Sequence, residues 1–553
     1  MHQFQQGDSK SRLQPVDLAD QLPLRTLAHV PDLRQEHVVD PSLVGKRNRR
    51  IHGIRCVWRI RRALLGLTLM LSLASGSATS TLAAQAPTAP APPTGAPVLS
   101  ASLRVRSEQW DWFGNEPAGK YGFVGALLRV GLSQAWTSAS WSVELAAPAL
   151  VGLPDNAIAA APRGQLGLGG TYSAANDRDN SPASVFVKQA YVRFGQPPSR
   201  GGHALRVGRF EFVDGTEMIP RHATLAALKR DHIAHRLLGT FGWTHVGRSL
   251  DGALYSFDRP GRVNVTALGA LPTRGVFDVK GMSSLDVRVG YAAATKAFAW
   301  RGGSGEWRLF SLAYHDRRTV LKTDNRALAV RQGDAKDIRV GTLGAHYLHV
   351  VQTGVGDVDL LLWGALQGGD WGGLTQRGSA GAAEIGFQPG SSNPLRPALV
   401  QPWIRAGWFR GSGDVDPSDG RNGTFFQVLP TPRIFARIPF YNLMNLEDVF
   451  GSLSLRTARV TLRAEVHGLR LAESADLWYQ GGGAFERQTF GYVGRPSGGS
   501  RGLATLLDVG ADVRLGALTL SAYAANASQR AVIMRLFPGG AGRLFYLEAE
   551  LRR

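Results

Sequence analysis

Residues 459–467 read Arg-Val-Thr-Leu-Arg-Ala-Glu-Val-His, so apolar side chains alternate with polar ones. Successive side chains of a β-strand point to opposite faces, and this period of two therefore predicts a strand. Val460 and Val466 would lie on its apolar face, and Arg463 and Glu465 on its charged face. The same alternation recurs at residues 103–106, 285–291, 503–515 and 545–551.

Two architectures accommodate such strands, a soluble β-sandwich and a membrane barrel with a wet lumen. The longer alternating segments run for about 9–13 residues, the length that a tilted strand needs to cross a bilayer. Strands of soluble proteins most often have about 5–6 residues. Past residue 100 no apolar run reaches the length of about 18 residues that a spanning helix requires. We therefore predict an all-β protein, a single transmembrane antiparallel β-barrel of about 18 strands with long extracellular loops.

Aromatic clusters and glycine-rich stretches punctuate the strands. The aromatic residues at 110–113, 403–409, 440–441 and 478–479 are expected to form girdles at the membrane interfaces. The expected outer loops are the polar, Gly-rich stretches 150–183, 367–399, 411–439, 474–500 and 526–542. The alternation changes phase between Val207 and Phe210, and a bulge at Gly208 would turn Arg209 and Glu211 inward.

The N-terminal region has the pattern of a secretory signal. An apolar core of 11 residues, 63–73, follows the basic pair Arg61 and Arg62, and small residues continue through Ala86. We expect residues 1–86 to be a signal peptide with an over-long basic extension, which suggests that translation starts within it. Residues 87–100 would form a Pro-rich periplasmic tail, and residues 101–553 the outer-membrane barrel.

Arginine dominates the charge of the chain. Lys and Arg number 63 against 43 Asp and Glu, a net charge of +20, and only 9 of the cations are Lys. Residues 1–86 hold 12 of the cations and 6 of the anions, which leaves +14 on the rest. A guanidinium group is a planar fork suited to carboxylates and phosphates. Because an exported protein does not meet nucleic acid, the excess charge indicates another anionic partner.

Several segments resemble the alginate export porin family. They include residues 411–433, which begin Gly-Ser-Gly-Asp-Val-Asp-Pro-Ser-Asp-Gly, and residues 445–453 and 476–485. Upstream, residues 205–215 and 248–252 resemble strand motifs of that family. The resemblance implies an 18-stranded barrel in the outer membrane of a Gram-negative cell, with an Arg-lined lumen that passes an acidic polysaccharide.

The charged strand faces supply the candidate functional residues. A cation that faces lipid at the bilayer midplane costs about 2–4 kcal/mol, so we expect these residues to line the lumen. The expected anion path comprises Arg104, Arg106, Arg193, Arg209, Arg288, Arg405, Arg463 and Arg514. Their expected acidic partners are Glu108, Glu211, Glu465, Asp508 and Asp512. Two roles remain open: the cations only brace the lumen through ion pairs, or the surplus also attracts anions.

A metal site is considered in the loop that carries the family resemblance. Asp414, Asp416 and Asp419 offer the oxygen ligands that calcium prefers, but they lack the spacing and the terminal Glu of a helix-loop-helix site. A solvated loop with turn-forming Asp and Gly explains the same residues. We expect no other cofactor.

The sequence thus predicts an outer-membrane porin for anionic solutes, with export of an alginate-like acidic polysaccharide as the specific function. The alternatives are a general diffusion porin of low selectivity and a barrel-embedded hydrolase. No nucleophile elbow, phosphate loop or His-Glu-x-x-His motif stands in the chain, so we expect no enzyme. The expected partners are outer-membrane lipid, an anionic polysaccharide or small anions, and periplasmic export proteins.

Overall fold

The structure is a computed structural model that describes residues 95–196, 200–390, 393, 400–431 and 435–553. The expected signal peptide and residues 87–94 of the expected Pro-rich tail lie outside the described residues, and the first strand already begins at Val98, within that tail. Within the described ranges, no helix is long and apolar enough to cross a membrane.

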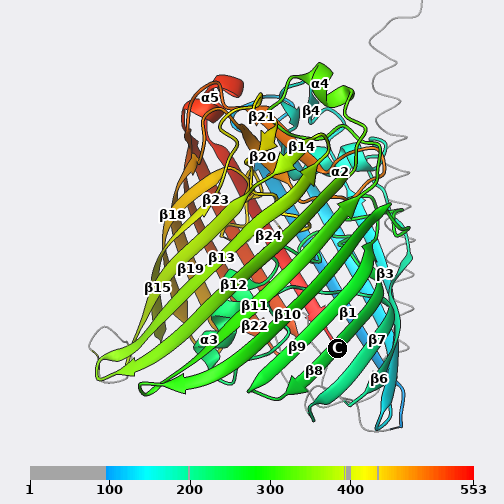
Figure 1. The fold of residues 1–553 in the computed structure, drawn as a ribbon, viewed down its shortest axis with the longest axis vertical. Helices are drawn as coiled ribbons and strands as arrows, with labels where there is room; N and C mark the ends of the chain where they lie inside the picture. Colours follow the sequence, from blue (N-terminus) through cyan, green and yellow to red (C-terminus); the bar gives the residue numbers. More distant parts are fainter. Residues whose placement is uncertain (1–94, 197–199, 391–392, 394–399, 432–434) are drawn as a thin grey trace, which may run out of the picture. The chain divides into compact units, whose positions relative to one another are not determined.

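Eighteen antiparallel strands form a closed barrel (Figure 1). Each pairs with its neighbours along the chain, and β1 closes the ring on β24 with Ser102 opposite Arg552. The strands are β1 (Val98–Asp111), β2 (Lys120–Ala135), β3 (Ala139–Val151), β6 (Phe186–Gly195), β7 (Gly202–Phe210), β8 (Leu250–Arg259), β9 (Val263–Pro272), β10 (Val287–Trp300), β11 (Gly303–Asp316), β12 (Ile338–Thr353), β13 (Gly356–Trp371), β15 (Ser379–Pro389), β16 (Gln401–Gly411), β18 (Leu446–Arg456), β19 (Val460–Leu471), β22 (Gly502–Leu515), β23 (Leu518–Gln529) and β24 (Gly542–Arg552). The predicted single antiparallel barrel is confirmed.

The outer face of the wall is apolar, as the alternation predicts. Val466 of β19 lies opposite Leu507 of β22, and their side chains are 50% and 55% exposed. Arg463, Glu465 and His467 of β19 point to the opposite, inner face. The exposed apolar band is the surface that contacts lipid in an outer-membrane barrel.

The two ends of the barrel differ in the length of their connections. Tight turns such as 260–262, 301–302 and 457–459 lie at one end, together with both termini of the barrel. Long connections lie at the other end and carry most of the small elements, seen at the top of Figure 1. They are β4 (Ile158–Ala159), β5 (Gly164–Gln165), α2 (Gly167–Ala175), α4 (Leu328–Gln332), β14 (Leu374–Gln376), β17 (Arg421–Asn422), β20 (Leu477–Gly481), β21 (Tyr492–Pro496) and α5 (Ala531–Leu536). Short turns mark the periplasmic end of such barrels, and long loops the extracellular end.

Four of the five expected outer loops are found at the extracellular end, but the expected loop 367–399 is wrong. β13 continues to Trp371 and β15 occupies Ser379–Pro389, so these residues form a hairpin of the wall. Its many Gly and Ala residues are strand positions with small side chains rather than loop positions. The long connection 211–249, between β7 and β8, was not expected from the sequence because it is not rich in glycine.

The expected aromatic girdles are mostly wrong as well. Trp112, Phe113 and Trp478 are almost completely buried, and the Phe113 ring lies 6.5 Å from that of Trp478 and 5.7 Å from that of Phe440. These rings pack the extracellular loops together instead of contacting the membrane interface. Trp408 belongs to one of the expected clusters and does face lipid, because it is 40% exposed on the outer face.

Candidate functional site

Six of the eight expected lumen arginines lie on the inner face: Arg104, Arg106, Arg193, Arg405, Arg463 and Arg514. The expected acids Glu108, Glu465, Asp508 and Asp512 share this face, and Glu211 follows β7 and contacts the inward Arg129. Two arginines are placed on the wrong face by sequence reasoning, each for its own reason.

Arg209 faces outward because the expected bulge at Gly208 does not occur. β7 keeps a continuous register through this glycine with both β6 and β8, so Arg209 stays on the face of the exposed Leu205 and Val207. The register shift lies instead between β3 and β6, where Lys188 is the additional residue. Arg209 forms a bidentate pair with Asp251, at 2.7 and 2.8 Å.

Arg288 also faces outward. It is exposed, whereas its neighbours Val287 and Val289 are buried on the inner face. The inner face is apolar here because apolar loop residues fill the lumen, and Phe212 packs on the inward Tyr291 with ring centroids 5.2 Å apart. In this part of β10, apolar side chains therefore do not identify the face that contacts lipid.

Most inward cations are neutralised by acids. Arg106 Nε lies 2.9 Å from Glu108 Oε1, and Arg104 Nε lies 3.7 Å from Glu548. Arg463 contacts Asp512 at 2.5 Å, and Arg129 lies between Glu144 and Glu211 at 2.6 Å from each. Bracing, one of the two roles left open by the sequence, is thus the arrangement of most of these residues.

The most deeply buried charges surround Arg405. Its guanidinium contacts Asp359 and lies 2.8 Å from Glu384 Oε2, and all three side chains are at most 2% exposed. His232 Nδ1 also lies 2.9 Å from Glu384 Oε2, and Arg236 donates to Glu384 Oε1 at 3.2 Å. Neither the His232 contact nor the Arg236 contact was expected from the sequence, because His232 and Arg236 belong to the unpredicted connection 211–249.

That connection, which we call the lumen loop (residues 211–249), runs through the barrel. It contains α3 (Ala223–Leu228) and a π-helical turn, Lys229–Ile233. Arg221 donates to the carbonyl of Pro260 in a periplasmic turn at 3.5 Å, and Gln388 near the periplasmic end of β15 donates to Thr224 at 2.9 Å. The loop therefore starts at the extracellular end, reaches the periplasmic end and returns.

Buried ion pairs attach the lumen loop to the wall. Lys229 Nζ lies 2.7 Å from Glu306, which also contacts His346 at 2.9 Å. Glu217 contacts Arg308 at 2.9 Å. Leu228, Ile233 and Leu237 of the loop are fully buried, so the loop also forms an apolar core within the lumen.

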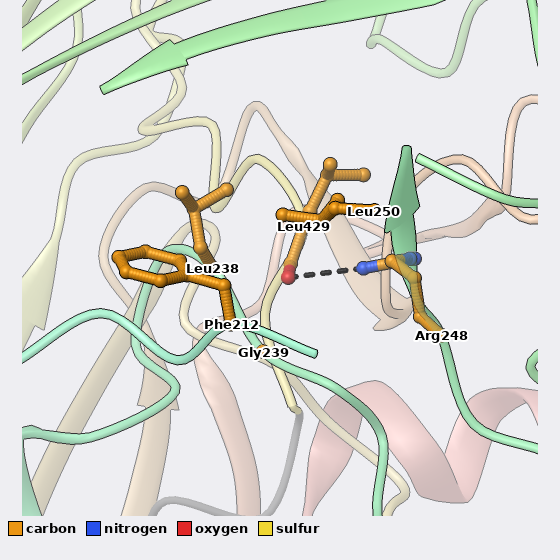
Figure 2. Close-up of a pocket in the computed structure, with 6 residues that line it drawn as sticks. All are labelled: Phe212, Leu238, Gly239, Arg248, Leu250 and Leu429. Carbon is orange, nitrogen blue, oxygen red and sulfur yellow. Dashed lines mark hydrogen bonds between the residues drawn. The ribbon is translucent and has the colours of Figure 1, made fainter. Parts of the chain in front are cut away.

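A second group of contacts joins the lumen loop to the extracellular loops. Figure 2 shows Arg248 beside a small apolar pocket lined by Phe212, Leu238, Gly239, Leu250 and Leu429. Arg248 donates to the carbonyls of Leu429, Gly482 and Ala484 at 2.9–3.1 Å. Burial lowers the pKa of this guanidinium to about 10. The Arg of the motif at 248–252 is thus a structural residue that connects three loops.

The three aspartates considered for calcium do not converge. Asp414 is buried and accepts from the Gly423 amide at 3.0 Å. Asp416 and Asp419 are exposed and accept from Ser418 and Arg421, two residues further along the chain. Over the described ranges these three form no cluster of ligand atoms. The residue that organises the loop is Asp476, which accepts from Thr424 at 2.6 Å and from Asp414 N at 3.0 Å.

Four inward arginines near the periplasmic end differ from the rest. Arg193, Arg206, Arg456 and Arg514 form no ion pair within the part of the chain that the structure describes. Arg206 stacks on Tyr191, and Arg456 on Trp403, at 4.7 and 4.8 Å from the ring centroids. Sequence reasoning missed Arg206 and Arg456, although Arg206 lies on the face opposite Leu205 and Val207. We call the four residues the periplasmic arginines.

With this geometry in view, the match of residues 164–513 to alginate export proteins is decisive, because it covers more than half of the chain. The chain belongs to the alginate export family. No curated protein sequence matches the chain. The family and the barrel place this chain in the Gram-negative outer membrane as a porin, which points to a transport channel rather than an enzyme.

Several solved structures are similar to the chain at low sequence identity. OccAB4 of Acinetobacter baumannii is 8% identical with a TM-score of 0.50, over 83% of this chain and 98% of that one. OpdK of Pseudomonas aeruginosa, solved with vanillate, is 9% identical with a TM-score of 0.48, over 82% and 98% of the two chains. A BenF-like porin of Pseudomonas fluorescens is 9% identical with a TM-score of 0.48, over 83% and 99%.

Proposed function

We propose that this porin exports an acidic, alginate-like polysaccharide from the periplasm through its lumen. The observation that carries the proposal is the position of the periplasmic arginines. They lie close to the periplasmic turns, where an exported polymer enters, and their charges are not cancelled by ion pairs within the described residues.

The arrangement of these arginines suits a polymer that must keep moving. Arg193 and Arg206 lie on β6 and β7, and Arg456 and Arg514 lie on β18 and β22, with several strands between the two groups in either direction around the barrel. Stacking on an aromatic ring fixes a guanidinium while its edge N–H groups stay available to a carboxylate. Two separated groups let successive sugar carboxylates bind in turn without one tight site that traps the chain.

Single-channel recording in planar bilayers tests the proposal. Wild-type channels should prefer anions, and mannuronate oligomers added on the periplasmic side should block the current more strongly than neutral oligosaccharides of equal length. Arg206→Ser and Arg456→Ser should each weaken the block about tenfold, the loss of about one charge-assisted hydrogen bond. Arg288→Ser, which removes an outward-facing arginine, is the matched control and should leave the block unchanged.

The alternatives predict other results. Equal block by acidic and neutral oligomers would indicate a general diffusion porin of low selectivity. Block by monomeric uronate that equals block by the oligomer would indicate passage of small anions rather than of a polymer.

A further inference from the structure

Two acidic side chains on the inner wall face each other without a cation between them. Glu465 of β19 lies directly opposite Asp508 of β22. Like charges in this arrangement destabilise a sheet. The nearby guanidinium groups are committed elsewhere, because Arg463 and Arg437 pair with Asp512 at 2.5 and 3.8 Å. Among the described residues, Glu465 and Asp508 form no ion pair.

A histidine completes this cluster. His467 lies two residues after Glu465 on the same face of β19, and one ligand atom from each of Glu465, His467 and Asp508 lies within 4.8 Å of the others. Within the described ranges, no other three His, Cys, Asp or Glu side chains meet in this way. His467 is 1% exposed and Asp508 is 4% exposed.

The hydrogen bonds of the cluster leave ligand atoms free. His467 Nδ1 lies 3.0 Å from Asp448 Oδ2, and since a carboxylate only accepts, Nδ1 carries the proton. The Nε2 atom then has an unshared electron pair, and it is buried without a hydrogen-bond partner among the described residues. The Oδ2 atom of Asp508 is also buried and also has no hydrogen-bond partner among the described residues.

We propose that Glu465, His467 and Asp508 bind a divalent transition metal ion of the zinc class on the inner wall of the barrel. One imidazole nitrogen and two carboxylates are a ligand set that zinc accepts, with water in the fourth position. Two negative charges match a dication, which removes the repulsion between the two acids. Asp448 is a positioning residue, because a carboxylate on the second ring nitrogen fixes the tautomer and the orientation of a metal-bound histidine. The imidazole disfavours calcium, which prefers oxygen ligands.

Metal content and affinity of the purified barrel test this proposal. The full chain is extracted in detergent with an affinity tag that lacks histidine, stripped with a chelator and titrated with Zn²⁺ against a competing dye, and bound zinc is measured by mass spectrometry. We expect one equivalent per chain for wild type, and a tetrahedral absorption spectrum when Co²⁺ replaces Zn²⁺. His467→Gln and Asp508→Asn should lose the equivalent, and Asp448→Asn should bind about 10–100-fold more weakly.

His346→Gln is the matched control. His346 is also buried on the inner face, but it pairs with Glu306 alone at 2.9 Å, so this variant should keep the zinc equivalent. Heat-modifiable migration on gels verifies that each variant folds, and Asp508→Asn decides the question where His467→Gln does not fold. The proposal would be overturned if the wild-type protein binds zinc only with the micromolar affinity of nonspecific sites. It would also be overturned if Asp508→Asn still binds one zinc ion per chain.

Discussion

Replacing Arg405 with Met tests whether the inner-wall arginines brace the barrel. The change leaves Glu384 with two partners, His232 at 2.9 Å and Arg236 at 3.2 Å. It leaves Asp359 with the neutral Trp403 N–H at 2.7 Å. Because Asp359 is completely buried, its charge is then almost uncompensated. Removing one partner of a buried ion pair costs about 3–5 kcal/mol, and we expect a loss in this range.

The free energy of unfolding is measured by urea titration of the barrel in lipid vesicles, followed by tryptophan fluorescence. Arg410→Met is the control, because its pair with Glu473 is 43% and 30% exposed, and such surface pairs contribute at most about 1 kcal/mol. Adding Asp359→Asn to Arg405→Met should restore at least about 1 kcal/mol, since the buried charge is removed with its partner. Equal losses for Arg405→Met and Arg410→Met would refute the reasoning.

Three further outcomes follow from the loops and the wall. Burial raises the pKa of Asp476 to about 6 from 3.8, so the folded loops retain a proton that the unfolded chain has lost. The stability of these loops should fall by up to about 3 kcal/mol as the pH rises from about 4 to 6, seen as faster trypsin cleavage, and Asp476→Asn should abolish this dependence. A short bismaleimide that joins Cys residues placed at Thr224 and Gln388 should leave the single-channel conductance unchanged, and a drop in conductance would show that the lumen loop moves. Arg209→Ser should leave anion selectivity unaltered because this arginine faces outward, and a measured loss of selectivity would contradict its placement.

The barrel itself was predictable because the lipid side imposes one rule on every strand. Val466 and Leu507 contact lipid whatever the lumen contains, so the period of two is visible from the sequence alone. Glu465, Asp508 and Arg463 were assigned to the inner face by the same rule, and the structure places them there.

The converse rule, that a charged side chain near a strand end faces inward, fails for two arginines. Arg288 is the second residue of β10, and Arg209 is the penultimate residue of β7. A cation costs about 2–4 kcal/mol at the midplane of the bilayer but only about 0–1 kcal/mol near its interfaces. The membrane therefore does not determine the direction of these two side chains.

The lumen loop was not predictable for a different reason. Its apolar residues, such as Leu228 and Ile233, are buried inside the barrel. The inner face of β10 therefore carries Val287 and Tyr291, although the simple rule for a barrel expects a polar inner face in contact with water. The partners of this packing are separated by tens of residues in the sequence. Neither the local period nor the composition of residues 211–249 identifies the strands that they contact.

The energy that holds the lumen loop also limits how this protein transports a solute. Withdrawal of the loop breaks the buried pairs of Lys229 with Glu306, Arg236 with Glu384 and Glu217 with Arg308. Glu306 keeps His346 and Glu384 keeps Arg405 on the wall, whereas Arg308 loses the acid that pairs with it. A buried charge that loses its partner costs about 3–5 kcal/mol, a large fraction of the stability of a typical domain, about 5–15 kcal/mol. A transport cycle that expels the loop is therefore disfavoured, and a solute has to pass beside it. Under the proposed export function, selectivity therefore depends on fixed wall residues, and we propose Arg206 and Arg456 at the periplasmic end, which stack on Tyr191 and Trp403.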